Sequence, residues 1–363
     1  MKSLVKNPKQ KRQTIAPALC GLLFLAALGA SAQAQQPTKE QWAASPELHS
    51  AAISVYHHVS NATPASTSIS PEQFEAHLRA LNDLEFTVSP LAEVVKTVLA
   101  GAVVKPKTVA ITFDDGYESI YTTALPLLQR YDMPFTLFIS TGPIDRNQRG
   151  YLSWTQLREL AAAGVTIGNH GSEHDSALSL NAAELRADIL HAQRRIDEEL
   201  GQQEKFFAYP YGEFNSRAQT VVAELGYLGF AQNSGAIGPT TSPLALPRFP
   251  LAGIYAELDS AQQKYATLAF PLETNTAIDP STRPEYLSLQ LQFHSENWRD
   301  GTLNCFDAGK PVRLEHDDQT FTLTLNEQPQ KIRRWLTTCT ARHPETGRYF
   351  WYSQPWTETQ WPL

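Results

Sequence analysis

The sequence is short of basic residues, of cysteines and of long apolar runs, and each shortage narrows what the chain can be. It holds 30 lysines and arginines against 37 aspartates and glutamates, which gives a formal net charge of −7. An acidic chain disfavours nucleic acids and anionic polymers as partners, whereas neutral or cationic substrates remain compatible. The length of 363 residues suffices for one large domain and a small second one.

The most apolar segment lies at the N-terminus. Basic residues between Lys2 and Arg12 precede the apolar residues 15–28, and the sequence Ala32-Gln33-Ala34 follows. This order is typical of an export signal with an A-x-A cleavage site, and the apolar run is too short for a membrane span. We expect residues 1–34 to be a signal peptide and the protein to be periplasmic or secreted, with no transmembrane helix in the mature chain.

Only two of the three cysteines, Cys305 and Cys339, lie beyond this segment. In an oxidising compartment we expect them to form a disulfide, which would contribute roughly 3–4 kcal/mol by closing the loop between them. The alternative is a pair of unbonded thiols that are buried as small apolar groups.

Strand-like and helix-like segments alternate regularly between residues 50 and 250. Capping patterns such as Ser153-x-x-Gln156 and Asn181-x-x-Glu184 mark where helices begin, and Gly164 and Gly201 mark where they end. This alternation predicts a parallel sheet. Polar residues follow the ends of several different strands, which favours a distorted parallel β/α barrel over an open sheet. The expected strands are residues 53–56, 108–113, 135–140, 165–168, 205–209 and 227–231.

The pattern changes after Pro250. Residues 271–284 are polar and contain three prolines, so we expect a linker between a catalytic domain (residues 35–270) and a small C-terminal all-β, sandwich-like domain (residues 285–363). The second domain is rich in tryptophans, which either stack on sugar rings or pack in the interior, and packing is the favoured reading. These tryptophans are Trp298, Trp335, Trp351, Trp356 and Trp361.

Four residues have the composition of a metal centre. Asp114 and Asp115 directly follow the apolar residues 109–113, and His170 and His174 follow a second apolar stretch. One carboxylate and two imidazoles provide three ligands and leave one position open, as in catalytic metal sites, while the second carboxylate is free to act as a base. The pattern predicts a hydrolase that depends on a divalent metal, with Zn²⁺ as the first choice and Co²⁺ or Ni²⁺ as alternatives. The plain alternative is a pair of helix-capping aspartates beside two ordinary histidines.

These residues carry a family resemblance. The strings Thr112-Phe113-Asp114-Asp115-Gly116, His170-x-x-x-His174 and Tyr209-Pro210-Tyr211-Gly212 resemble the motifs of NodB-like polysaccharide deacetylases, carbohydrate esterase family 4. The resemblance spans about residues 50–255, and Tyr56-His57 is similar to the branch that acts on poly-β-1,6-N-acetylglucosamine. It implies hydrolysis of N-acetyl groups from an acetylated polysaccharide.

The same resemblance implies a role for each site residue. Asp115, His170 and His174 would hold the metal, and Asp114 would be the general base. The backbone N–H of Tyr211 would help to stabilise the oxyanion, and His57 would protonate the departing amine, with the adjacent His58 as the alternative acid. The carbonyl of an N-acetyl group is a poor electrophile, so the reaction needs a Lewis acid to polarise it. The amine is a poor leaving group, so it needs a proton donor.

The sequence departs from the family pattern at two positions near the candidate site. Gly171 stands where a serine or threonine is usual, and the arginine that often precedes Pro-Tyr is absent, so we expect Arg248 to supply that charge beside Asp114. These departures keep open the alternative of a catalytically weakened polysaccharide-binding protein. A second alternative, with the same mechanism, is an esterase that removes O-acetyl groups from a polysaccharide.

Overall fold

The computed structural model describes residues 44–201, 203–273, 278–281, 288–293, 298–299, 301–317, 320–327 and 332–358. The expected signal peptide and Trp361 lie outside these ranges. The described residues all belong to one unit, residues 36–363. Within them, none of the helices has the length and apolar character that a membrane crossing requires.

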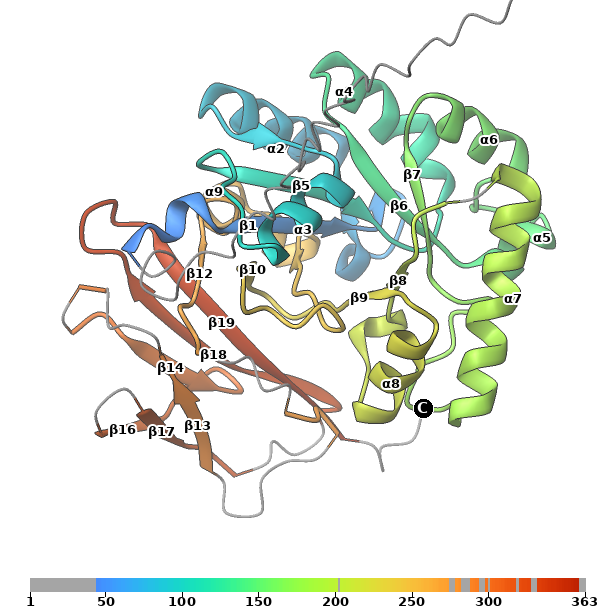
Figure 1. Cartoon of the computed structure of the whole chain (residues 1–363). Helices are drawn as coiled ribbons and strands as arrows, with labels where there is room; N and C mark the ends of the chain where they lie inside the picture. Colours follow the sequence, from blue (N-terminus) through green and yellow to red (C-terminus); the bar gives the residue numbers. More distant parts are fainter. Residues whose placement is uncertain are drawn as a thin grey trace, which may run out of the picture. The chain divides into compact units, whose positions relative to one another are not determined.

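The larger part of the fold is a curled, mainly parallel sheet with helices packed against it (Figure 1), as predicted. Its strands follow the order β10-β1-β5-β6-β7-β8-β9, and all neighbours are parallel except β10 and β1. Two short strands flank this path, since β11 pairs with β1 and β4 pairs with β5. The strands are β1 (Ala51–Tyr56), β4 (Thr87–Val88), β5 (Thr108–Phe113), β6 (Phe135–Ile139), β7 (Thr166–Asn169), β8 (Phe206–Ala208), β9 (Leu228–Phe230), β10 (Ala236–Ile237) and β11 (Phe249–Pro250).

Side chains cap the start of several helices, and the capping boxes at Ser153 and Asn181 were expected from the sequence. Ser70, Ser153 and Asn181 each form a capping box, and Gly201 ends the longest helix with a φ of 76°. The helices are α2 (Pro71–Asp83), α3 (Leu91–Leu99), α4 (Leu125–Arg130), α5 (Thr141–Asp145), α6 (Trp154–Ala162), α7 (Ala182–Leu200), α8 (Ser216–Glu224) and α9 (Leu258–Tyr265).

The sheet is buried on both faces, which is why its strands read as continuous apolar runs. All six residues of β1 and of β5 are buried. Alternate side chains point to opposite faces, so Val109, Ile111 and Phe113 join one apolar cluster while Ala110 joins another. The strands are therefore packed on both faces, and this packing holds the polar residues at their carboxyl ends along one edge.

A buried histidine links α2 to this sheet and to α9. The Nε2–H of His77 donates to the carbonyl of Ala256 at 2.8 Å, and Nδ1 accepts from the Tyr56 hydroxyl at 3.0 Å. The Tyr56 hydroxyl lies 2.5 Å from that of Tyr265. Burial lowers the pKa of His77 to about 4. The imidazole is therefore neutral in the folded protein at neutral pH.

We expect His77 to make the protein sensitive to acid. An unfolded histidine titrates near pH 6.5, so between about pH 6.5 and pH 4 the unfolded chain binds more protons and stability falls as the pH falls. Denaturant titrations of the protein and of His77→Gln should show their difference in unfolding free energy shrinking by roughly 3 kcal/mol from pH 7 to pH 4. A difference that stays constant over this range would contradict the assignment.

The C-terminal part is all β, as predicted. A five-stranded sheet has the order β12-β19-β18-β14-β15, and a three-stranded sheet has the order β13-β17-β16. The strands are β12 (Leu268–Ala269), β13 (Ser288–Gln292), β14 (Asn304–Asp307), β15 (Lys310–Pro311), β16 (Arg313–Asp317), β17 (Thr320–Thr324), β18 (Arg334–Arg342) and β19 (Tyr349–Thr357). Trp298, Trp335 and Trp356 are buried in one apolar cluster between these strands. Packing therefore accounts for these three tryptophans.

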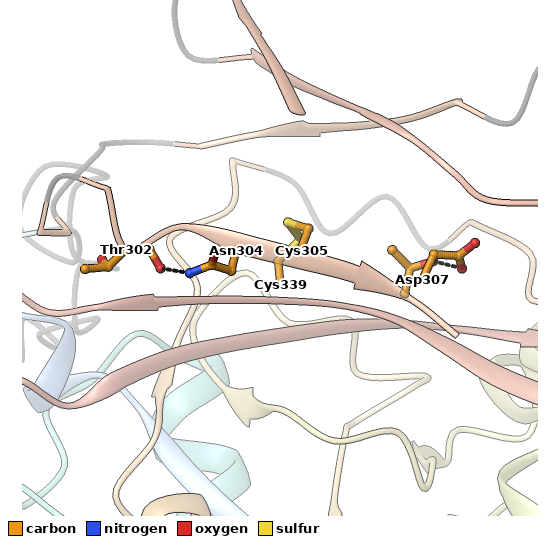
Figure 2. Close-up of a disulfide and its surroundings, with 6 residues drawn as sticks. Thr302, Asn304, Cys305, Asp307 and Cys339 are labelled. Carbon is orange, nitrogen blue, oxygen red and sulfur yellow. Dashed lines mark hydrogen bonds between the residues drawn. A yellow bond between two sulfur atoms is a disulfide. The ribbon is translucent and has the colours of Figure 1, made fainter. Parts of the chain in front are cut away.

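The disulfide prediction is confirmed. Cys305 of β14 and Cys339 of β18 are directly opposed in the antiparallel ladder and their sulfurs are bonded (Figure 2). The bridge joins residues 34 apart in sequence, and it ties together two strands whose other stabilisation comes from the buried cluster.

The β-rich part begins earlier than the expected linker. β12 pairs with β19, and Phe270 and Leu272 are already buried in the C-terminal cluster. Pro280, within the expected linker of residues 271–284, accepts a hydrogen bond from the Thr357 N–H at 2.8 Å. The division into a catalytic and a C-terminal domain, with its boundary, remains a prediction.

Candidate metal centre and active site

The predicted site residues meet at the carboxyl edge of the sheet. Asp114 and Asp115 follow β5, His170 follows β7, Tyr211 follows β8 and His57 follows β1. Parallel strands end along one edge, so residues that are far apart in sequence become neighbours there. The shared edge explains why strand ends were the informative positions in the sequence.

Three donor atoms converge on one point. Oδ1 of Asp115 lies 3.2 Å from Nε2 of His170 and 3.2 Å from Nε2 of His174, and the three ligand atoms lie within 4.8 Å of one another. Nδ1 of His170 donates to the Ala208 carbonyl at 2.8 Å, which leaves the Nε2 lone pair facing Asp115.

This geometry fits a divalent cation. Oδ1 of Asp115 and Nε2 of His170 are buried and make no hydrogen bond with any described residue. Burial raises the pKa of Asp115, but the His170 and His174 side chains outweigh it and hold that pKa well below its usual range. Burial likewise opposes the charge on His170, yet Asp115 raises the pKa of His170 above its ordinary value. A bound cation would give both of these buried atoms a partner.

The backbone is strained at three of the site residues. Asp115, His174 and Tyr211 have φ values of 75°, 61° and 60°. Side chains other than glycine rarely adopt this left-handed region, which costs of order 1–3 kcal/mol per residue. Such a concentration of strain is typical of places where geometry serves function.

Asp114 forms a salt bridge with the positively charged side chain of Arg248. Arg248 donates to its two carboxylate oxygens at 2.7 and 2.8 Å, and both side chains are fully buried. Burial by itself would raise the pKa of Asp114, but Arg248 and then His170 outweigh it, so the pKa lies below its usual value. Arg248 thus lies beside Asp114, as expected from the sequence, while its catalytic role stays a prediction.

Further contacts fix the orientation of Arg248. Its Nε donates to the Ala231 carbonyl at 2.8 Å and its Nη1 to Oγ1 of Thr112 at 3.2 Å. The guanidinium also lies over the Phe138 ring, 5.2 Å from the centroid. These contacts satisfy donors that would otherwise be buried without partners.

The two adjacent histidines have different surroundings. His57 lies near Gln232, with 3.5 Å between Nε2 of the ring and Nε2 of the amide. Burial lowers the pKa of His57, and Asp115 and Asp114 oppose this effect only in part. His58 instead stacks on Tyr117, with 3.5 Å between the ring centroids. His57 is therefore the histidine that shares a neighbour with Asp114, which favours it as the acid.

Two residues of the site were missed from the sequence. Nε2 of Gln232 donates to Oδ2 of Asp114 at 3.3 Å and so stands between that carboxylate and His57. Its position just after β9 is a signal of the same kind that identified the others. Tyr117 has no such signal; burial and Asp115 raise its pKa, so the phenol stays protonated beside the metal ligand.

The structure gives a reason for Gly171. Its φ is 77°, and a Cβ there would lie 2.7 Å from Oδ2 of Asp188. Oδ1 of Asp188 accepts from the Ser172 N–H at 3.0 Å, and Oδ1 of Asn169 accepts from the Gly171 N–H at 2.9 Å. These carboxylate and amide groups hold the segment between His170 and His174.

We expect Gly171→Ser to weaken metal binding by about 10- to 100-fold, because the new side chain displaces Asp188 and shifts the histidines. Gly164→Ser is the matched control, since Gly164 also has a left-handed φ (89°) but open space around it. Metal titration against a competing chelator measures both. Equal affinity of the two variants would show that Asp188 does not need the space.

The Tyr211 segment is fixed from two sides. The Tyr211 ring meets the His174 ring edge-on, with 4.4 Å between the centroids, and Arg334 donates to the Tyr211 carbonyl. The next residue but one, Glu213, is buried and accepts two hydrogen bonds from Arg333 at 2.8 and 2.9 Å. The β-rich part therefore helps to hold the segment that carries the predicted oxyanion donor.

Comparison with known protein families matches residues 101–230 to the polysaccharide deacetylases. The YxkH protein of Bacillus subtilis (strain 168) is 28% identical over 204 residues, which cover 56% of this chain and 68% of that protein. A poly-β-1,6-N-acetyl-D-glucosamine N-deacetylase of Staphylococcus aureus (strain MRSA252) is 27% identical over 194 residues, or 50% of this chain and 67% of that protein.

Solved structures share the fold. The Streptococcus pyogenes deacetylase PplD, in complex with acetate, aligns with a TM-score of 0.56 and 23% identity over 60% of this chain and 99% of its own. IcaB from Ammonifex degensii aligns with a TM-score of 0.54 and 23% identity, over 60% and 97%. Both likenesses support the fold prediction.

Proposed function

The chain belongs, through its domain at residues 101–230, to the polysaccharide deacetylase family, and from that premise we propose that it removes N-acetyl groups from N-acetylglucosamine units of a polysaccharide by metal-dependent hydrolysis. One observation supports this proposal above all. Buried Asp115 and His170 and partly buried His174 form a set of converging donors beside a separate, ionised carboxylate that is paired with a buried arginine.

The proposed roles follow from the surroundings of each residue. Asp115, His170 and His174 would hold a divalent cation, with Zn²⁺ as the first choice, and such a cation would supply Lewis acidity. Asp114, which Arg248 keeps ionised, accepts the proton of the water. The Tyr211 N–H donates to the developing oxyanion, since a preformed dipole costs no reorganisation during the reaction.

The leaving amine needs a proton, and His57 is proposed to deliver it. Burial lowers the pKa of His57, and Asp115 and Asp114, which favour the charged imidazole, oppose this only in part; the Gln232 amide lies beside both the ring and Asp114. Arg248 is a positioning residue in this scheme, because it acts on the reaction through Asp114.

The setting of the protein is proposed from the same features. The S. aureus relative bears the name of a poly-β-1,6-N-acetyl-D-glucosamine deacetylase, and we take a polymer of this type as the first candidate substrate. The Cys305–Cys339 disulfide suits an oxidising compartment, which agrees with the export signal expected at residues 1–34.

Acetate release tests the proposal. The purified mature protein, with its metal content measured, is incubated with poly-β-1,6-N-acetylglucosamine, chitin oligomers, peptidoglycan and acetylxylan, each with and without a chelator. We expect chelator-sensitive release from an N-acetylated glycan, restored by added Zn²⁺. Release from acetylxylan alone would favour an O-acetyl esterase, and tight binding without release would favour a binding protein.

A further inference from the structure

A cleft of about 320 Å³ opens beside the candidate active site. One wall comes from the sheet and helix part of the fold, with Tyr211, Gln232 and Tyr255. The opposite wall comes from β18 and β19, with Arg334, Leu336 and Thr357. The cleft therefore combines residues of the curled-sheet part with residues of two strands of the β-rich part.

The cleft is continuous with the predicted catalytic residues. Gln232 lines it and also donates to Oδ2 of Asp114 at 3.3 Å. Tyr211 lines it and meets the ring of the metal ligand His174. A polymer whose acetyl group lies at Asp114 would therefore extend directly into this space.

The lining suits a sugar ring. Tyr211 and Tyr255 are large aromatic residues that stay 44% and 57% exposed, although the interior of the fold accepts most other aromatic rings. Leu336 adds an apolar surface on the far wall, and the side chains of Gln232, Asn233 and Thr357 add hydrogen-bonding groups. Sugars present apolar ring faces and polar edges, which such a mixture of aromatic and amide groups recognises.

Hydrogen bonds attach the β-rich wall of the cleft to the Tyr211 segment. Arg333 holds the buried Glu213 with two hydrogen bonds, Arg334 donates to the Tyr211 carbonyl, and its guanidinium lies over the Tyr211 ring at 5.9 Å from the centroid. Binding on a preformed wall loses less conformational entropy than binding that must order a loop.

We propose that this cleft is a saccharide subsite that binds sugar units next to the one being deacetylated, and that β18 and β19 thereby take part in substrate recognition. The inference rests on the proposed function, because it assigns the polymer's neighbouring units to a defined place. It makes the reaction dependent on chain length: an oligomer that reaches the cleft is hydrolysed with a higher kcat/KM than one that does not.

Variants on the two walls test the subsite. Tyr255→Ala removes an exposed ring from one wall, and Leu336→Trp fills space from the other. Ile254→Ala is the matched control, since Ile254 neighbours Tyr255, is 80% exposed and does not line the cleft. Phe306→Ala, at an exposed residue of β14, controls for changes in the β-rich part.

The readout is kcat/KM for acetate release from fully acetylated oligomers of increasing length, from the dimer to the hexamer. Each wall variant should lose about five- to tenfold on the longest oligomers and little on the dimer, whereas both controls keep the wild-type profile. A length profile unchanged in Tyr255→Ala and Leu336→Trp would overturn the subsite and leave the deacetylase assignment intact.

A separate measurement keeps the subsite testable if no acetate is released. Calorimetric titration of the hexamer into the wild-type protein and into Tyr255→Ala measures the subsite without chemistry. Weaker binding by Tyr255→Ala, with Ile254→Ala unchanged, would support the cleft although the proposed activity had failed. Equal binding by all three proteins would overturn the cleft as well.

Discussion

Asp115→Asn is expected to abolish metal binding and hydrolysis together, whereas Asp114→Asn should keep the metal and lose about a thousandfold in kcat. Asp115 contributes one of three converging donors, and two imidazoles alone hold a divalent ion poorly. Asp114 points to Arg248 instead, so its amide variant leaves the ligand set intact while it removes a base whose contribution is roughly 10²- to 10⁴-fold.

The two variants are compared by metal analysis after dialysis and by acetate release at saturating oligomer. Asp132→Asn, an exposed position before β6 where asparagine suits the left-handed backbone, is the conservative control and should match the wild type in both assays. If Asp114→Asn lost the metal and Asp115→Asn retained it, the roles of the two carboxylates would have to be exchanged.

Arg248→Met is expected to destabilise the fold by about 3–5 kcal/mol and to reduce hydrolysis sharply. The substitution leaves a fully buried carboxylate without its charged partner, and that loss costs far more than the pair contributes to stability. Without the guanidinium, burial raises the pKa of Asp114, so less of the base is ionised at neutral pH.

The double variant Asp114→Asn with Arg248→Met separates pairing from packing. Because it no longer holds an unpaired buried charge, its unfolding free energy should exceed the value that the two single variants predict by addition. Arg342→Met, which removes an exposed arginine from β18, should cost less than about 1 kcal/mol. Strict additivity of the two single effects would indicate that Arg248 and Asp114 do not depend on each other.

Cationic and imidazole side chains reduce the repulsion between the adjacent carboxylates of Asp114 and Asp115. Two adjacent carboxylates repel each other unless cations separate their roles. Arg248 pairs with Asp114 and the two histidines lie at Asp115, so the first carboxylate would stay ionised as the proposed base and the second would be available as the proposed ligand. Arg248 would then neutralise Asp114, and a bound metal ion would neutralise Asp115.

Much of this was predictable from local signals. The helix limits followed from side chains that satisfy free backbone groups, as at Ser153 and Asn181, and the strands followed from apolar runs that a two-sided burial requires. Because parallel strands share one edge, the polar residues after β5 and β7 could be combined into a candidate metal centre from the sequence alone.

The remaining features depended on contacts between distant segments. Arg248 is 134 residues from Asp114, and Gln232 is 118 residues from it, so neither pairing has a local signature. In the sequence, Gly171 is a departure from the family's usual serine or threonine. Its close approach to Asp188 in the structure explains why a glycine fits there. The sequence by itself determined the elements and the ligand types, since these reflect neighbouring residues and strand ends. The family resemblance suggested Arg248 as the partner of Asp114, but only the tertiary structure placed the two side chains together and determined which strands line the cleft, because packing between remote segments sets those distances.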